Sequence, residues 1–189
     1  MLSIAVMADK RRQEMVDYLL DKLGDVPVFY DDGQGIWHNR VQATLAYDKN
    51  ATHHLVLQDD AILCKDFITQ VCSEINKRPE HILNLYFGNR VKMREAAQKA
   101  LPNGGYETNW LSWGVGIVTP TKYIEEMISY CNGIQGLDNH DDTRMARYIR
   151  HKGLKVWYPL PSLVDHRVSQ SLMENVEGSH RVAFKFLGE

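Results

Sequence analysis

The chain has 189 residues, of which 44% are hydrophobic and 24% charged, and its formal net charge at pH 7 is −2. This length and balance indicate one globular domain with a proper core, and they give no global electrostatic signal for nucleic acid. The three cysteines form no metal-ligand spacing, and their odd number argues against a disulfide framework. No window approaches the ~20 apolar residues of a membrane span, and the N-terminus is too short for a signal peptide. We therefore expect a cytoplasmic protein without a membrane partner.

Short apolar runs alternate along the chain with segments of helical periodicity. Strands are expected, in chain order, at 2–8, 26–30, 55–57, 82–87, 115–118 and 154–158. The expected helices are one ending at Gly24, a weaker one over 37–47, one capped by Asp66, one capped by Thr121 and one from Asp138 to Gly153. Segment 89–109 has the least regular pattern and is expected to be a mobile loop. The alternation predicts an α/β fold with a mainly parallel twisted sheet flanked by helices.

The strand at 55–57 leads directly into Gln58, Asp59 and Asp60. In open α/β sheets, ligands bind at the carboxyl ends of the strands. Two carboxylates at that edge suit a divalent cation, and a cation suits a phosphate-bearing substrate. The alternative is an ordinary turn, where aspartate is common. The apolar strand favours the functional interpretation, because it places both acids at a sheet edge.

A second acid pair, Asp141 and Asp142, lies in the first turn of the predicted helix at 138–153. With Asp138 as N-cap, Asp141 falls at a position where capping and the helix dipole can account for a carboxylate. Asp142 shares the apolar face of the helix with Met145 and Ile149, so it is either buried against a partner or faces a cleft. A cleft position suits a general base.

Two further features are candidates for the same site. A lone histidine such as His166 is more often structural than a ligand, so only its combination with Asp60 makes it a candidate metal ligand. Trp110, Trp113 and Gly114 precede a strand, where glycine permits close approach of a ligand and the indole rings offer flat faces to sugars or bases. The alternative for these three residues is a bulky edge of the core.

Taken in order, these residues resemble a GT-A glycosyltransferase. Residues 55–60, with Phe67 downstream, are similar to the Leu-x-Leu-Glu-Asp-Asp signature of the lipopolysaccharide and collagen galactosyltransferase group. Segment 114–120 resembles the acceptor-side strand, and 141–153 resembles the Glu-Asp helix of inverting members. Small phage-encoded glycosyltransferases are similarly compact. Gln58 replaces an acid of the signature and Asp141 replaces the usual Glu, which leaves open which acid of the second pair is the base.

The resemblance implies a nucleotide-sugar donor whose diphosphate is held by Mn²⁺ or Mg²⁺. Asp60 and His166 would be the metal ligands, with Asp59 assisting near the ribose or the metal. Asp142 would deprotonate an acceptor hydroxyl in an inverting transfer, and Asp141 would hold the acceptor. Further donor contacts are expected from Ala5, Met7, Asp31, Arg40 and Gln58, and acceptor contacts from Trp110, Trp113 and Gly114.

The resemblance also implies a single GT-A-like domain over 1–189. It would contain a donor-nucleotide half (1–88), the mobile loop (89–109), an acceptor and catalytic half (110–166) and a tail (167–189). The expected acceptor is a hydroxymethylated pyrimidine in phage DNA, which would have to be flipped out of the duplex, or a glycan. A phage-encoded enzyme would act in the host cytoplasm, and the oligomeric state is open. Basic residues that could meet DNA phosphates are Lys92, Arg94, Lys99, Arg144, Arg147 and Arg150.

Two other functions are alternatives. A divalent-metal-dependent phosphohydrolase could use both acid pairs and His140 for two metal ions, although its His-Asp version belongs to an all-helical fold. A non-catalytic nucleotide-sugar-binding module would keep the aromatic residues but has no need of acids at three separate places. A Rossmann dehydrogenase is unlike this chain, because the first strand leads into an Asp-Lys-Arg-Arg sequence without the required glycines.

Overall fold

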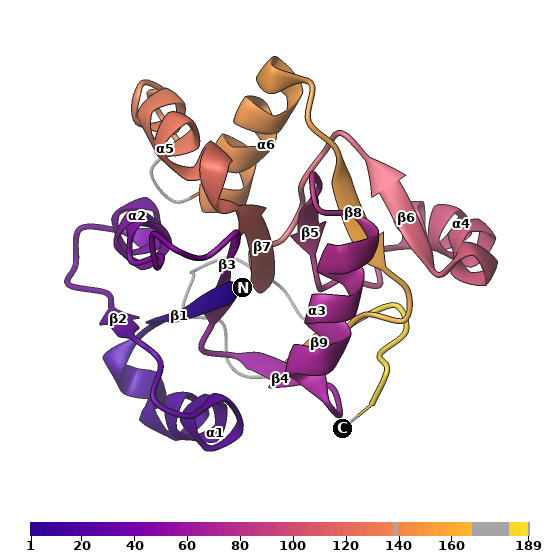
Figure 1. Ribbon diagram of the computed structural model, residues 1–189, viewed down its shortest axis with the longest axis horizontal. Coiled ribbons are helices and arrows are strands. Elements are labelled where there is room, and N and C mark those ends of the chain that lie inside the picture. The colour runs from indigo at the N-terminus through magenta and orange to yellow at the C-terminus, as the bar shows by residue number, and fades with distance from the viewer. Residues whose placement is uncertain (138–139, 168–181, 189) are drawn as a thin grey trace.

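The computed structural model describes residues 1–137, 140–167 and 182–188. At its centre lies a seven-stranded sheet in the order β2-β1-β3-β7-β5-β8-β6 (Figure 1). The strands are β1 (Leu2–Ala8), β2 (Val28–Tyr30), β3 (His53–Gln58), β5 (Ile82–Asn84), β6 (Gly105–Thr108), β7 (Gly116–Pro120) and β8 (Val156–Pro159). Only β6 and β7 run against the other strands of this sheet. The predicted mainly parallel α/β sheet is therefore confirmed.

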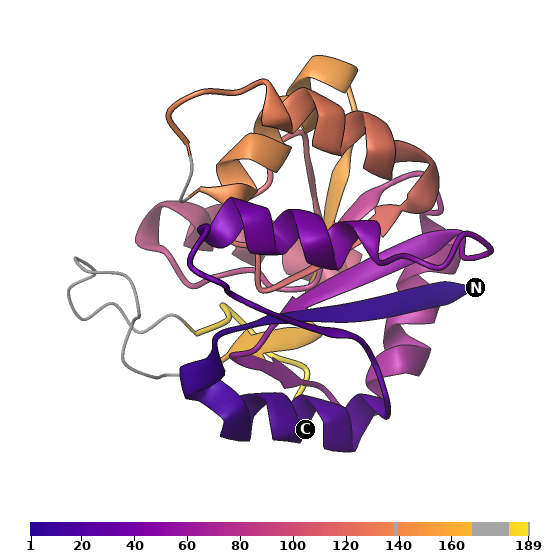
Figure 2. The same cartoon turned by 90° about the vertical axis from the view of Figure 1, so that its left-hand side faces the viewer.

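Helices cover both faces of the sheet (Figures 1 and 2). They are α1 (Gln13–Leu23), α2 (Ile36–Leu45), α3 (Phe67–Lys77), α4 (Val91–Ala100), α5 (Ile124–Asn132) and α6 (Asp141–Lys152). The apolar sides of α1 and α3 pack into one core cluster, whereas those of α5 and α6 pack into another on the opposite side. Successive residues of a strand point to opposite faces, so Val6 of β1 joins the first cluster while Ala5 and Met7 pack toward α2.

Strand β3 is the centre of the arrangement, parallel to β1 and antiparallel to β7. Leu55 and Leu57 face one core cluster and Val56 faces the other side of the sheet. Burying each such side chain is worth about 1.5–3 kcal/mol. A strand buried on both faces reads as a continuous apolar run, which is the pattern seen in the sequence. The strand ends at Gln58, so the acids that follow it lie at the edge of the sheet.

A two-stranded antiparallel ribbon, β4 (Ala61–Leu63) with β9 (Val164–His166), lies beside the main sheet. The amides of Leu163 and Val164 donate to Leu85 O at 3.0 and 3.1 Å, which attaches the ribbon to the chain following β5. In the ribbon Ala61 is paired with His166. The pairing brings a histidine from late in the chain next to the acids that follow β3.

The predicted mobile loop at 89–109 is wrong, because this segment forms α4, a 3₁₀ turn (Leu101–Asn103) and β6. Ala97 and Ala100 face the core from α4, and small residues give a helix a weak apolar signal in the sequence. Thr121, the predicted cap, begins a 3₁₀ turn ahead of α5, and the N-cap residue of α5 is Tyr123, which makes no side-chain cap bond. Asp66 is the N-cap residue of α3, also without such a bond, and the predicted cap Asp138 lies outside the described residues.

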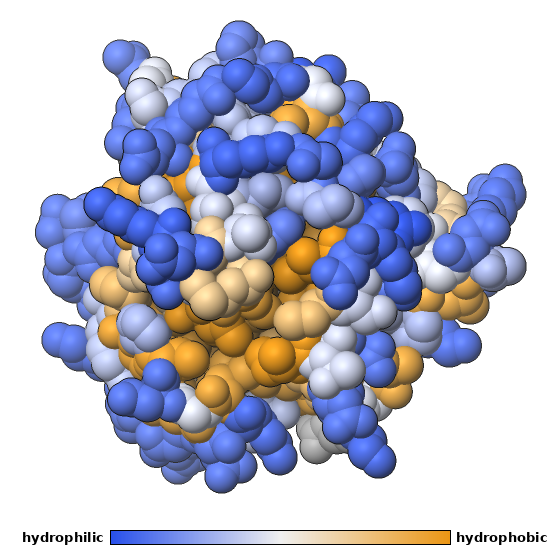
Figure 3. Space-filling model, in the orientation of Figure 1, coloured by the Kyte–Doolittle hydropathy of each residue, from blue (hydrophilic) through white to orange (hydrophobic). Residues whose placement is uncertain are grey.

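One face of the molecule carries an apolar surface between α1 and α3 (Figure 3). Here Leu2 and Ile4 of β1 and Leu20 and Leu23 of α1 are only partly buried against the core. Within the described residues, no helix combines the length and the apolar character that crossing a membrane requires.

Candidate active site

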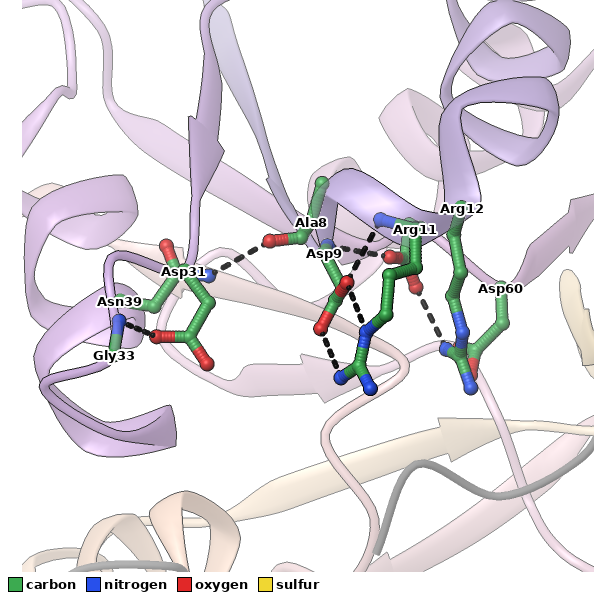
Figure 4. Close-up of polar contacts among 9 residues, drawn as sticks. Ala8, Asp9, Arg11, Arg12, Asp31, Gly33, Asn39 and Asp60 are labelled. Carbon is green, nitrogen blue, oxygen red and sulfur yellow. Dashed lines mark hydrogen bonds and ion pairs between the residues drawn. The ribbon is translucent and has the colours of Figure 1, made fainter.

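Three parallel strands end at one edge of the sheet, and an aspartate follows each of them. Asp9 follows β1, Asp31 follows β2 and Asp59 follows β3. The backbone keeps these ends together, because Asp31 N donates to Ala8 O at 2.8 Å and Asp59 N donates to Met7 O at 3.0 Å. Asp9 and Asp31 lie on either side of the end of β1 (Figure 4). This edge is the place where open α/β sheets bind ligands.

Arg12, at the end of the 3₁₀ turn Lys10–Arg12, reaches over the same edge (Figure 4). Its Nη1 lies 2.9 Å from Asp59 Oδ1 and 2.7 Å from Asp60 Oδ2. The second oxygen of Asp59 accepts a hydrogen bond from Asp9 N at 2.8 Å. Asp59 and Asp60 are only 4% and 5% exposed, so each depends on such partners to stay charged.

The predicted metal ligands Asp60 and His166 lie side by side. His166 Nε2 is 3.2 Å from Asp60 Oδ2, and Arg167 N donates to Asp60 O at 2.8 Å. This contact follows from the register of the β4–β9 ribbon. Asp60 Oδ1 and His166 Nδ1 are buried and have no hydrogen-bond partner within the described part of the chain.

The pKa values of the two neighbouring carboxylates are shifted in opposite directions. For Asp59, burial dominates and raises its pKa above the ordinary value, and the charge of Asp60 adds to the effect. Burial also opposes ionisation of Asp60, but His166 and Arg12 together outweigh it and lower the pKa of Asp60. Asp60 is therefore ionised at neutral pH, the form that a cation ligand needs.

Asp141, the first residue of α6, forms a buried ion pair with Arg40 of α2. Arg40 Nε donates to Asp141 Oδ2 at 2.7 Å, and Arg40 Nη2 donates to Gly114 O at 2.7 Å. A Cβ on residue 114 would lie 2.6 Å from Arg40 Nη2, so a larger residue there would displace this buried guanidinium. Arg40 is 1% exposed, so it offers no surface to a donor, and the expected donor contact is replaced by a structural role.

Asp142 holds the loop that precedes β7. Its Oδ2 accepts a hydrogen bond from Trp113 N at 2.9 Å. Trp113 has φ of 64°, a left-handed conformation that is costly for a bulky residue and needs support from its surroundings. Asn84, fully buried at the end of β5, gives this backbone further support by donating to Ser112 O at 2.7 Å and Trp113 O at 2.9 Å. The tryptophan backbone is thus fixed from two sides.

Aromatic rings connect the two acid pairs. The Trp113 ring makes an edge contact with Tyr86 at a centroid distance of 5.7 Å. The Tyr86 ring in turn lies 6.2 Å from the His166 ring. A chain of contacts from Asp60 through His166, Tyr86 and Trp113 thus leads to Asp142.

No protein-family model matches the chain, and no curated protein matches its sequence. Solved structures do match. A mutant of Drosophila β1,4-galactosyltransferase 7 in complex with manganese, UDP-Gal and xylobiose has a TM-score of 0.50 at 13% identity, over 97% of this chain and 83% of that one. The chain has a GT-A-like fold.

A second structure of that galactosyltransferase, its catalytic domain with xylobiose, has a TM-score of 0.50 at 11% identity, over 95% of this chain and 76% of that one. The protein A197 from STIV has a TM-score of 0.55 at 11% identity, over 89% of this chain and 87% of that one. The structural matches establish the GT-A-like fold. Because the sequence identities are so low, the chemistry has to be argued from the residues of the site.

The residues at the edge of the GT-A-like sheet fit a metal ion whose remaining ligands come from a substrate. Within the described ranges, no three His, Cys, Asp or Glu side chains are placed to hold an ion. Asp60 and His166 would supply two ligands, and Mg²⁺-like ions are often held by one or two protein groups together with phosphate oxygens and water. The buried Asp60 Oδ1 without a partner supports this fit, because an unsatisfied buried oxygen is costly and a cation would satisfy it.

The other predicted contact residues differ in how far their side chains are exposed. Ala5 is fully buried and packs toward Ala43 of α2, so it offers no surface to a donor, and Met7 is 7% exposed. Gln58 is partly exposed at the end of β3. Trp110 is 38% exposed, and the guanidinium of Arg150 lies 5.7 Å from its ring. Asp31 is also partly exposed, with Oδ1 accepting a hydrogen bond from the backbone two residues on.

The basic residues suggested for phosphate binding differ in burial. Arg144 is 3% exposed and donates to the carbonyl oxygens of Cys131, Ile134 and Leu137, so its suggested role toward DNA is replaced by a structural one. Its guanidinium anchors the chain that follows α5. Of the candidates whose side chains the structure describes, Arg94, Lys99, Arg147 and Arg150 are exposed, and the side chain of Lys92 lies outside that description.

Sequence reasoning missed two polar residues of this site. Arg12 belongs to the Asp-Lys-Arg-Arg sequence that was used only to exclude a dinucleotide fold. A cationic turn directly after a buried strand was itself a signal, because it lies at the ligand-binding edge. Asn84 interrupts an apolar run, and a polar residue inside a buried strand must have partners.

Proposed function

We propose that the protein is a metal-dependent glycosyltransferase that moves a sugar from a nucleoside-diphosphate donor to an acceptor hydroxyl, with inversion at the sugar carbon. The observation that carries the proposal is the meeting of Asp60 and His166, 3.2 Å apart at the ligand-binding edge of a GT-A-like sheet. The manganese and UDP-Gal in the structurally similar galactosyltransferase support the class of donor and cofactor.

On the donor side, Asp60 and His166 would hold the divalent ion, Mn²⁺ or Mg²⁺. When bound, the ion neutralises the negative charge that develops on the departing nucleoside diphosphate. Asp59 is braced by Asp9 and Arg12, so it fixes the geometry of Asp60. Asp31, partly exposed at the neighbouring strand end, is the donor contact that we propose for the nucleoside.

On the acceptor side, Asp142 is the general base. Its carboxylate takes the proton of the acceptor hydroxyl while that oxygen attacks the anomeric carbon and the bond from this carbon to the phosphate oxygen breaks. Asp141 is buried against Arg40, so we assign it to positioning the loop at Gly114 rather than to holding the acceptor. Asp142 is only partly buried and lies beside the aromatic loop.

The acceptor is proposed to lie over Trp110 and the loop that ends at Gly114. A partly exposed indole with Arg150 beside it offers a flat face and a positive charge. Such a face stacks on sugar rings and on nucleic-acid bases alike. The acceptor classes to be compared are therefore a glycan and a hydroxymethylated pyrimidine in DNA.

The test is a thermal unfolding screen with nucleoside diphosphates and Mn²⁺, alone and together. We expect a large rise in Tm only when both are present, because a ligand at 100 times its Kd adds about 2.7 kcal/mol of stability. EDTA should abolish the rise, and Asp60→Asn should prevent it. The matched control is Asp21→Asn, whose side chain is 78% exposed on α1. Nucleotide binding that is unaffected by EDTA would contradict the metal-dependent part of the proposal.

Product analysis separates the proposal from its rivals. Nucleotide sugars identified by the screen are incubated with oligosaccharides and with hydroxymethylcytosine-containing DNA. The masses of the products are then determined by mass spectrometry. A glycosyltransferase adds one sugar mass to one acceptor class and releases a nucleoside diphosphate. A phosphohydrolase instead cleaves the donor without acceptor, and a binding module gives no product.

A further inference from the structure

Arg12 lies where a cation at this site would lie. Its Nη1 is within 3 Å of both carboxylates, at 2.9 Å from Asp59 and 2.7 Å from Asp60. The oxygen that it contacts on Asp60 is the one that lies 3.2 Å from His166 Nε2. The Arg12 side chain is 13% exposed, so its charge is partly withdrawn from water. The guanidinium would therefore compete with a divalent ion that uses Asp60 Oδ2 together with His166 Nε2, whereas Asp60 Oδ1 has no partner among the described residues.

A divalent ion bound to Asp60 would lie against this guanidinium, and two positive charges in a weakly solvated space repel each other strongly. The repulsion is relieved when a dianionic diphosphate arrives at the same edge. An arginine prefers planar, two-point binding to phosphate oxygens. Arg12 follows the end of β1, the edge where the diphosphate would lie, so it can exchange carboxylate oxygens for phosphate oxygens by a change of side-chain conformation.

We propose that Arg12 serves as a built-in counter-ion that occupies the cation position until the donor binds, so that divalent-metal binding depends on the nucleoside diphosphate. The inference rests on the proposed function and concerns how its metal site is regulated. It also explains how two adjacent buried carboxylates are tolerated without metal, because removing the partner of a buried charge is strongly destabilising.

Arg11 supplies a matched control from the same turn. It also pairs with an aspartate, through Nε at 2.9 Å and Nη2 at 2.7 Å from the Asp9 oxygens. Its side chain is 68% exposed, and neither of its bonds involves Asp59 or Asp60. Replacing Arg11 removes one charge from the same region without vacating the cation position.

The experiment measures Mn²⁺ affinity of the full chain directly, by the loss of the free-ion electron paramagnetic resonance signal, with and without UDP. In wild type, UDP should tighten Mn²⁺ binding by about tenfold or more, which corresponds to 1.4 kcal/mol. Without UDP, Arg12→Gln should bind Mn²⁺ about tenfold more tightly than wild type, and UDP should tighten Mn²⁺ binding less in this variant than in wild type, by the contribution of its phosphate oxygens alone. Arg11→Gln should behave as wild type.

Arg12→Gln leaves two buried carboxylates without their cation, so its folding is checked by circular dichroism and the series includes Arg12→Lys. A lysine keeps the charge but reaches the two acids with a single compact group, so its Mn²⁺ affinity without UDP should lie between those of wild type and Arg12→Gln. If only the lysine variant folds, it must still bind Mn²⁺ more tightly than wild type for the proposal to stand.

The outcomes separate this inference from the proposed function. Wild-type protein that binds Mn²⁺ equally well with and without UDP would overturn the role of Arg12 and leave a metal-dependent transferase intact. The same holds if folded Arg12 variants bind Mn²⁺ no better than wild type. Absence of Mn²⁺ binding to every protein, even with UDP, would overturn both, and Arg12 would then be the permanent cation of the site.

Discussion

At the scale of single residues, neighbouring acids in this protein have different roles because their surroundings differ. Asp141 is 6% exposed and paired with Arg40, whereas Asp142 is partly exposed and bonded to the backbone of Trp113. The same division separates Asp59, braced by the chain after β1, from Asp60, which keeps one oxygen without a partner among the described residues. In each pair one carboxylate has a mainly structural environment, and we propose the other for the chemistry of the site.

This division predicts a specific effect of Asp142→Asn. The asparagine keeps a side-chain oxygen for the Trp113 amide and loses the acceptor of the Thr143 amide, so the loop before β7 and donor binding should survive. It cannot accept the proton of the acceptor hydroxyl, and the loss of a general base lowers kcat by roughly 10²–10⁴-fold. The measurement is steady-state transfer with the donor found in the binding screen, together with UDP binding by calorimetry. Full activity of Asp142→Asn would show that another residue is the general base.

Asp141→Asn is the control for the same experiment, since the change is identical and the position adjacent. It leaves Arg40 buried without its carboxylate, which costs about 3–5 kcal/mol of unfolding free energy. Urea unfolding should show that loss for Asp141→Asn and a smaller one for Asp142→Asn. The reverse order would show that Asp142 is the structural acid.

At the scale of elements, the site depends on pairings that fix short segments in place. Strand β6 is an edge strand paired with β8, and the side chain of Trp157 packs against Gly105. A Cβ on Gly105 would lie 2.2 Å from Trp157 Cζ2 and 2.5 Å from Tyr158 O. Glycine is required there for close packing, because the carbonyl oxygen cannot move aside as a flexible side chain does.

Gly105→Ala should therefore destabilise the protein by about 1–3 kcal/mol, the usual cost of overpacking a well-filled core. Urea unfolding monitored by tryptophan fluorescence measures the change, and Trp157 itself is a suitable reporter. The control is Gly133→Ala, where an added Cβ meets only Tyr130 O at an ordinary 3.4 Å. Equal stabilities of the two variants would contradict the packing described for β6.

At the scale of the whole molecule, two buried histidines at the start of β3 link stability to pH. Burial lowers the pKa of His53 and of His54 below the ordinary value, because the charged imidazole is poorly solvated there. His54 Nδ1 lies 2.8 Å from Ser3 Oγ, and its Nε2 lies 2.9 Å from Ala43 O. Because unfolding exposes both rings, the unfolded chain binds protons at a higher pH than the folded chain.

Stability is therefore expected to be complete above the unfolded pKa of about 6.5 and to decline as the pH falls below it toward the folded pKa. Each histidine contributes up to about 1.4 kcal/mol per pH unit in that window. Urea unfolding from pH 7.5 down to pH 5 measures the slope. His54→Gln removes one titrating group, so the slope should be shallower; an unchanged slope would exclude His54 as its source.

The sequence by itself determined the α/β class, because buried parallel strands read as apolar runs separated by helical periodicity. It also predicted which acids follow strands, since the end of an apolar run marks the edge of the sheet. It did not predict α4 and β6, where small and polar residues give weak periodicity, nor the pairing of β4 with β9. That pairing joins residues far apart in the sequence, and no local pattern encodes a non-local register.

The tertiary structure decided which of the predicted residues meet. It placed His166 against Asp60 through the register of the ribbon, and it set Arg12 across the two acids that follow β3. It also turned Arg40 from an expected donor contact into the buried partner of Asp141. The physical reason is that residue type fixes what a side chain can do, whereas burial and neighbouring charges fix what it does. Those surroundings arise only when distant segments pack together.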